Sequence, residues 1–255
     1  MPPASIAQTN LQLYNQLLSQ GRSVEQLAQA KSAYDLACLI YSAHYQADGK
    51  PFISHTVGVA SILSQLGLPI EVVAFGLVHN VYGNGDFGDG RQHRSTRARR
   101  LRVREAVGAE VEALVHRFRH FRITGKTIDR IEADLDSYGE LERRLILTDL
   151  ADHLEKYADD GVLYFGDSTW VTDEVTLYGD RMIVMAERLG HPRLGEMMRQ
   201  RFDAVAGKPL APRILRPGDQ KYLEMILPLS ARKRLSTRLA AWRQRWRSRR
   251  NNSPG

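Results

Sequence analysis

Residues 51–80, which read PFISHTVGVASILSQLGLPIEVVAFGLVHN, constrain the fold of this chain more than any other stretch. Apolar residues recur there at the spacing of one helix face, namely Val59, Ile62, Leu63 and Leu66. Gly67 predicts the end of this helix, and Pro69 predicts the start of the next. The second helix is apolar nearly all round, which predicts that it is buried. Two histidines, His55 and His79, open and close this helix pair, and we expect them to face one cleft.

A third candidate for the same cleft is Asp152, which lies far downstream at the end of the apolar run LILTDLAD. The packing stripe of that helix consists of Leu147, Leu150, Ala151 and Leu154. Asp152 therefore points away from the stripe. Imidazole and carboxylate groups are ligands that suit Zn, Mn or Fe. The alternative is that His55 and His79 are hydrogen-bonded core histidines without any ligand.

Three segments resemble the HD-domain metal-dependent phosphohydrolases, above all the hydrolase domain of the RelA/SpoT family. They read AYDLACLIYSAHYQADGKPFISHTVGVASILSQLGLPIEVVAFGLVHN, AVGAEVEALVHRF and ILTDLADHLEKY. The resemblance covers roughly residues 27–190 and implies an all-α, HD-domain-like helical bundle. It also implies that His55, His79 and Asp152 bind a divalent metal ion (Mn, Fe or Zn), which activates water for attack on phosphorus. Asn80 stands where the family has a metal-binding aspartate, so we expect weaker metal binding and no bridging ligand.

Other parts of the family's catalytic apparatus differ in this sequence. The acidic pair expected after the HD motif is missing, because no carboxylate follows before Asp86. The basic pair that holds guanine in the family corresponds to Gln46 and Ala47. The asparagine expected four residues after Asp152 is Lys156. Hydrolysis of guanosine tetraphosphate is therefore not expected.

The loop HNVYGNGDFGDGR looks like that of a divergent branch of HD-like proteins that carry His-x-x-Tyr-Gly and a following Phe-Gly. Its Gly, Asn and Asp residues tolerate unusual backbone angles and make polar contacts. We expect Asp86 and Asn84 to act in catalysis and Asn80 to be a weak metal ligand. We expect Tyr82 and Arg91 to contact the substrate. For each of these residues the alternative is a structural turn that side chains cap.

These observations lead to the hypothesis of a divergent HD-like, metal-dependent hydrolase that acts on a small anionic, phosphate-bearing substrate. The arginine-rich run from Arg91 to Arg104 would attract such an anion, unless it is only a solvated helix face. One alternative is a catalytically inactive HD-like scaffold that binds a ligand or has a regulatory role. An HD-type iron oxygenase is another, although the missing bridging carboxylate counts against it.

Composition divides the chain into an N-terminal segment (1–22), a helical domain (23–206) and a proline-containing linker with a basic tail (207–255). Hydrophobic residues make up 43% of the chain, which is enough for a core. No stretch reaches the ~18 consecutive apolar residues of a membrane span, and no secretory signal is recognisable. The single cysteine, Cys38, is expected to be a buried small hydrophobe. We therefore expect a cytoplasmic protein.

The tail carries nine lysines and arginines and no acidic residue after Glu224, so the rest of the +7 chain has a net charge of about −2. Trp242 and Trp246 continue a stripe that begins at Leu235, while arginines such as Arg243 fill the other faces. This pattern predicts a basic amphipathic helix that binds an anionic membrane surface or an acidic partner through residues 232–250. Packing on the domain is the alternative, and nucleic acid fits less well. Binding of the tail to a membrane surface would make the protein peripherally membrane-attached.

Overall fold

The computed structural model describes residues 5–89, 93–165, 170–215, 224–226 and 239. Within these ranges the chain forms eleven α-helices and one pair of two-residue strands, which confirms the predicted all-α class. None of the helices in the described part is both long and apolar enough to span a membrane.

The first five helices bring the two histidines into the core. They are α1 (Asn10–Ser19), α2 (Val24–Ile40), α3 (Phe52–Gln65), α4 (Ile70–Val78) and the short α5 (Val81–Asn84). A capping box starts α2, because the Ser23 side chain accepts from the Gln26 amide and the Gln26 side chain accepts from the Ser23 amide. Gly67 ends α3 with a φ of +72°, a conformation that L side chains rarely adopt.

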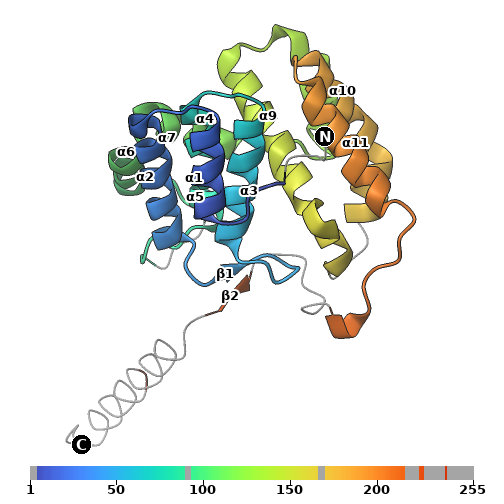
Figure 1. Cartoon of the computed structure of the whole chain (residues 1–255), viewed down its shortest axis with the longest axis horizontal. Helices are drawn as coiled ribbons and strands as arrows, with labels where there is room; N and C mark the ends of the chain where they lie inside the picture. Colours follow the sequence, from blue (N-terminus) through green and yellow to red (C-terminus); the bar gives the residue numbers. More distant parts are fainter. Residues whose placement is uncertain (1–4, 90–92, 166–169, 216–223, 227–238, 240–255) are drawn as a thin grey trace, which may run out of the picture.

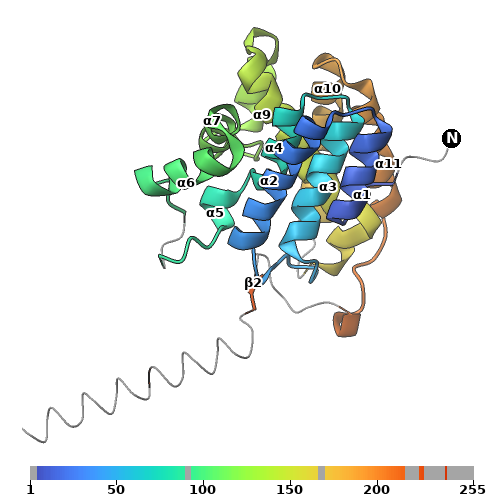
Figure 2. The same ribbon diagram turned by 60° about the vertical axis from the view of Figure 1, so that its left-hand side comes forward.

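Six further α-helices follow, namely α6 (Arg97–Val107), α7 (Ala109–Phe118), α8 (Ile128–Ala133), α9 (Glu140–Lys156), α10 (Asp180–Arg188) and α11 (Pro192–Val205). Short 3₁₀ turns cover Leu135–Ser137, Ala158–Tyr164 and Arg213–Leu215, and a π-helix covers Trp170–Gly179. Helices α6 and α7 lie on one side of the bundle and α10 and α11 on the other (Figures 1 and 2). The helices α3, α4 and α9 lie between these two pairs.

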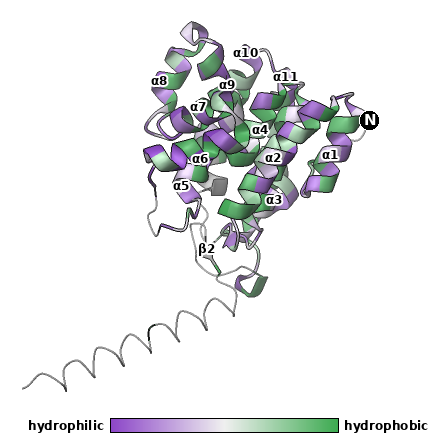
Figure 3. Cartoon of the chain, turned by 90° about the vertical axis from the view of Figure 1, so that its left-hand side faces the viewer, coloured by the Kyte–Doolittle hydropathy of each residue, from purple (hydrophilic) through white to green (hydrophobic). Residues whose placement is uncertain are grey.

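The helix α4 forms the centre of the core, as the all-round apolar pattern predicts. Every residue from Ile70 to Val78 except Glu71 is buried. Figure 3 shows α4 in the hydrophobic colour at the middle of the bundle, with polar residues on the outer faces of the surrounding helices. Because α4 packs against α2, α3 and α7, the residue at its end, His79, is enclosed on several sides.

A glycine lets α3 and α9 approach each other closely enough to bring distant residues together. A Cβ atom built on Gly58 would lie 2.5 Å from Cγ of Glu155, so no larger residue fits without displacing that carboxylate. This contact joins the α3 face that carries His55 to the α9 face that carries Asp152. The packing of α3 on α9 therefore decides where the candidate site forms.

The two strands, β1 (His44–Tyr45) and β2 (Glu224–Met225), pair antiparallel, with His44 opposite Met225. The amide of Ile226 also donates to the Ala43 carbonyl at 2.7 Å. Downstream of these residues, the predicted amphipathic helix falls almost wholly outside the described residues, including Trp242, Arg243 and Trp246. Its binding to a membrane surface or acidic partner stays a prediction.

Candidate metal centre

Three side chains from three helices converge at the centre of the bundle. His55 lies on α3, His79 caps α4 and Asp152 lies on α9, and all three are at most 2% exposed. The Nε2 atom of His55 lies 2.9 Å from Oδ1 of Asp152, and Nε2 of His79 lies 3.3 Å from the same oxygen. One ligand atom from each residue lies within 4.8 Å of those of the other two. The sequence-predicted trio therefore meets in space.

Both imidazole rings are held so that Nε2 faces this meeting point. Nδ1 of His55 contacts a carboxylate oxygen of Glu155, and Nδ1 of His79 lies 2.7 Å from the Gly76 carbonyl oxygen. The carbonyl can only accept, so the His79 Nδ1 carries the proton and its Nε2 keeps a free lone pair. Histidines that bind metals characteristically donate their other ring N–H to a carboxylate or a backbone carbonyl in this way.

The spacing of the three atoms suits a shared ion. A metal with bonds of about 2.0–2.2 Å to nitrogen and oxygen places neighbouring ligand atoms roughly 2.8–3.6 Å apart, from octahedral to tetrahedral geometry. The distances of 2.9 and 3.3 Å to Asp152 Oδ1 lie within that range. Among the described residues, buried atoms with no aligned hydrogen-bond partner include Nε2 of His79 and Oδ1 of Asp152.

The second oxygen of Asp152 contacts two cations. Arg122 donates from Nη2 at 2.6 Å, and Lys156 donates from Nζ at 2.9 Å. The same guanidinium places Nε 2.6 Å from Oδ1 of Asp149 and lies 4.7 Å above the Phe118 ring. Arg122 therefore bridges two buried carboxylates at the edge of the centre, where 28% of its side chain is exposed.

These contacts set the protonation of the two carboxylates. Burial alone would raise the pKa of Asp152, but Lys156 and Arg122 outweigh it and hold that pKa well below its usual range. Burial would likewise raise the pKa of Glu155, but the neighbouring His55 and Lys50 lower it. The Lys50 ammonium lies 2.7 Å from Oε1 of Glu155. Both carboxylates are therefore ionised near neutral pH.

The two histidines differ in their pKa although both are fully enclosed. Burial lowers the pKa of the His79 ring, and the opposing effect of Asp152 does not restore it. Burial also lowers the pKa of the His55 ring, but Glu155 and Asp152 together outweigh burial and leave it raised. The His79 ring is thus neutral, whereas His55 has a carboxylate partner on each side.

Asn80, which was expected to be a weak metal ligand, lies beside the centre. Its Oδ1 accepts a hydrogen bond from Nη1 of Arg122 at 3.3 Å. The same arginine also contacts Asp152, so Asn80 is linked to the centre through Arg122. The amide oxygen of Asn80 therefore already accepts a hydrogen bond from the guanidinium.

The loop after His79 places its expected site residues differently. Tyr82 is 1% exposed, and its hydroxyl donates to Glu112 at 3.0 Å rather than to the histidines. Asp86 is exposed, and its Oδ1 accepts the Gly88 amide at 2.7 Å, which is the turn-capping role weighed as the alternative. Asn84 is half-buried in the last turn of α5. Arg91 lies outside the described residues.

Sequence reasoning missed the residues that support the centre, namely Lys50, Arg122, Asp149 and Glu155. A signal existed for Glu155, because it follows Asp152 by three residues on one helix and therefore lies on the same face. No local pattern marks Arg122, which comes from the irregular segment after α7. Its role depends on tertiary packing alone.

The fold and this centre define an all-α protein with a buried His–His–Asp group that could hold a metal ion. Residues 39–122, about a third of the chain, match the family described as Domain of unknown function (DUF6817). The match includes His55, His79 and Arg122 but not Asp152. A search of curated proteins found no match. The resemblance to HD-domain hydrolases stays a prediction.

Proposed function

We propose that His55, His79 and Asp152 hold one divalent metal ion (Mn, Fe or Zn) and that the protein is a divergent HD-like hydrolase of small, phosphate-bearing anions. The observation that carries this proposal is the convergence of three buried ligand atoms whose rings are already oriented by Glu155 and the Gly76 carbonyl. Core histidines without a ligand do not need both Nε2 atoms turned to one carboxylate oxygen.

A bound divalent ion would supply Lewis-acid polarisation of a phosphoryl oxygen and a water of lowered pKa. The chain's own residues supply orientation. Glu155 fixes the His55 ring, while Arg122 and Lys156 hold Asp152 by its second oxygen and leave Oδ1 directed at the histidines. The same two cations would attract an anion that approaches from the exposed side of Arg122.

The charges around the centre support an anionic substrate. Three cations (Lys50, Arg122 and Lys156) contact three carboxylates (Asp149, Asp152 and Glu155), so these six side chains are balanced before any ion binds. A divalent ion that displaces any proton from the His55 ring leaves a net charge of two positive units in a site that excludes much water. A doubly charged anion such as a phosphate monoester would neutralise that excess.

The same balance favours a second candidate function, a catalytically inactive HD-like scaffold. The carboxylate of Asp152 already has two cationic partners, and Asn80 adds no negative charge. Metal binding would then be weak, and the cluster would serve stability. An HD-type iron oxygenase is less well supported, because Asn80 removes the carboxylate that would bridge a second iron.

Turnover assays distinguish the two candidates. The full chain, reconstituted separately with Mn, Fe and Zn, would be tested for phosphate release from p-nitrophenyl phosphate and nucleoside monophosphates. The hydrolase proposal expects metal-dependent turnover that disappears in His79→Ala. It also expects lower turnover in Asp86→Ala and Asn84→Ala, because we propose that these two residues act in catalysis. A protein that binds metal but releases no phosphate from any of these esters would instead be the inactive scaffold.

A further inference from the structure

A second site candidate lies on the other side of α7 from the metal centre. It is an open cavity of about 720 Å³ between α6, α7, α8 and the start of α9. Leu141 in its wall and Asp152 lie eleven residues apart on α9, which corresponds to about 16 Å along the helix axis. The cavity therefore shares no side chain with the metal centre.

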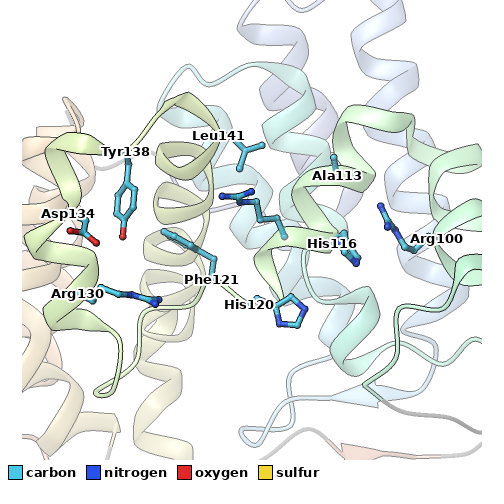
Figure 4. A pocket seen from close by; sticks show the side chains of 10 residues that line it. Arg100, Ala113, His116, His120, Phe121, Arg130, Asp134, Tyr138 and Leu141 are labelled. Carbon is cyan, nitrogen blue, oxygen red and sulfur yellow. The ribbon is translucent and has the colours of Figure 1, made fainter.

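Cations and aromatic rings line this cavity together. Figure 4 shows Arg130 and Tyr138 on one side of the opening and His116 and His120 on the other, with Phe121 between them. The rings of Phe121 and Tyr138 are in edge-to-face contact, with centroids 5.4 Å apart. An edge-to-face pair beside an open volume leaves a ring surface on which a planar group can stack.

The cavity's arginines differ in how far their charge is neutralised. Arg100 makes two hydrogen bonds to the buried Glu112, and Arg117 contacts Glu142 at 2.6 Å. For the guanidinium of Arg130, no hydrogen bond or ion pair occurs with any described residue. The one carboxylate in the lining, Asp134, opposes an anion, so Arg130 is the lining arginine whose guanidinium has no carboxylate partner in the described part of the chain.

The histidines on α7 add hydrogen-bonding groups to these cations. His116 and His120 are one helical turn apart, with ring centroids 6.4 Å apart. Burial and the nearby Arg100 lower the pKa of His116, so its ring is neutral at pH 7 and can both donate and accept. A volume of several hundred Å³ with a few polar groups on an aromatic and aliphatic wall is typical of a small-molecule site.

We propose that this cavity binds a small molecule that joins a planar aromatic ring to a phosphate group, as nucleotides do. The ring would stack against Phe121 and Tyr138, and the phosphate would be held by Arg130 with Arg117. Guanidinium groups bind phosphate through paired, charge-assisted hydrogen bonds, and Arg130 has this capacity unused. This inference does not rest on the metal centre and goes beyond the proposed function.

Calorimetric titration of the full chain in EDTA tests the inference apart from any metal. The probes are ADP, adenosine and inorganic pyrophosphate. We expect one ADP per chain, with adenosine and pyrophosphate each binding at least about tenfold more weakly, because each lacks half of the recognised group. Arg130→Ala should weaken ADP at least about tenfold. Tyr138→Ala should weaken ADP but not pyrophosphate.

Two controls locate the binding. Arg199→Ala changes a half-exposed arginine on α11 and should leave the ADP affinity unchanged. Arg243→Ala changes the basic tail and should also leave it unchanged. Absence of saturable ADP binding, equal binding of ADP and pyrophosphate, or an affinity that responds to Arg243→Ala but not to Arg130→Ala would each overturn the inference.

Discussion

The metal centre and the arginine-rich cavity both gather histidines and cations, but their charges have different partners. At the centre, Arg122 spans Asp149 and Asp152, and both carboxylates are 1% exposed. In the cavity, Arg130 is exposed and no described residue pairs with it. A cation that neutralises buried carboxylates stabilises the fold, whereas an unpaired cation at an open surface is available to a ligand. The comparison predicts that removing an arginine lowers the free energy of unfolding strongly at the centre and hardly at the cavity.

The largest expected effect follows from removing the arginine of each region. Arg122→Met leaves two buried carboxylates without their cation and should lower the free energy of unfolding by about 3–5 kcal/mol. Arg130→Met should change it by no more than about 0.5 kcal/mol, because no described group loses a partner. Urea denaturation of both variants in EDTA measures the difference. Similar losses in the two variants would contradict the contrast between the regions.

The next effect concerns the carboxylate that orients His55. Glu155→Gln keeps the shape of the side chain but removes the charge that contacts Nδ1 of His55. Metal affinity should fall about 10–100-fold, as expected for the loss of an outer-shell partner. The matched control is Glu142→Gln, which breaks the contact with Arg117 near the cavity and should leave metal affinity unchanged. Competition with a chelating dye gives both affinities.

A gain of function sharpens the comparison further. Asn80→Asp places a carboxylate beside the centre and should tighten metal binding by about tenfold or more, because it adds a negative charge close to the ion. Asn84→Asp, which adds the same charge within the same loop, should have a much smaller effect. Equal gains from the two variants would mean that position 80 has no special relation to the ion.

The smallest effect is a pH dependence at Glu112, the buried carboxylate that pairs with the cavity residue Arg100. Burial alone would raise the pKa of Glu112, but its bonds to Arg100 and Tyr82 outweigh burial and lower it. A group whose pKa is lower in the folded state contributes stability above its unfolded pKa and loses it as the pH falls through the folded pKa. Glu112→Gln should therefore be destabilising at pH 7, and the difference from the parent should shrink below about pH 4.

Unfolding titrations at pH 7 and in acid measure this difference. Glu110→Gln is the control, because Glu110 is 59% exposed and pairs only with Arg144 at the surface. A gap between Glu112→Gln and the parent that stays constant with pH would show that the contacts of Glu112 do not depend on its charge.

The helical core and the three candidate ligand residues could be predicted from the sequence because each leaves a local pattern. The run Ile70–Val78 is apolar on every side and is buried as expected. Gly67 marks the end of α3 by its need for a positive φ. His55 and His79 follow from these helix boundaries, and Asp152 from its place off an apolar stripe. Periodicity is sufficient for such residues because it fixes the buried face.

The supporting shell could not be predicted in the same way. Arg122 reaches Asp149 and Asp152 from an irregular segment, and Lys50 reaches Glu155 across 105 residues. Tyr82 was expected at the substrate, yet its hydroxyl bonds to Glu112 on α7. The cavity depends on the relative placement of four elements. Of its lining residues, only Arg100 belongs to a pattern visible in the sequence, the arginine-rich run. These features depend on helix packing, which no local spacing encodes.

Metal content is the most direct measurement of the central claim. Elemental mass spectrometry would be applied to protein purified without added metal or chelator and after reconstitution with Mn, Fe or Zn. The account predicts about one equivalent per chain, lost in Asp152→Ala and kept in Asp134→Ala, whose carboxylate lines the cavity instead. Circular dichroism would verify that both variants fold. Absence of metal under every condition, or its retention in folded Asp152→Ala, would contradict the account.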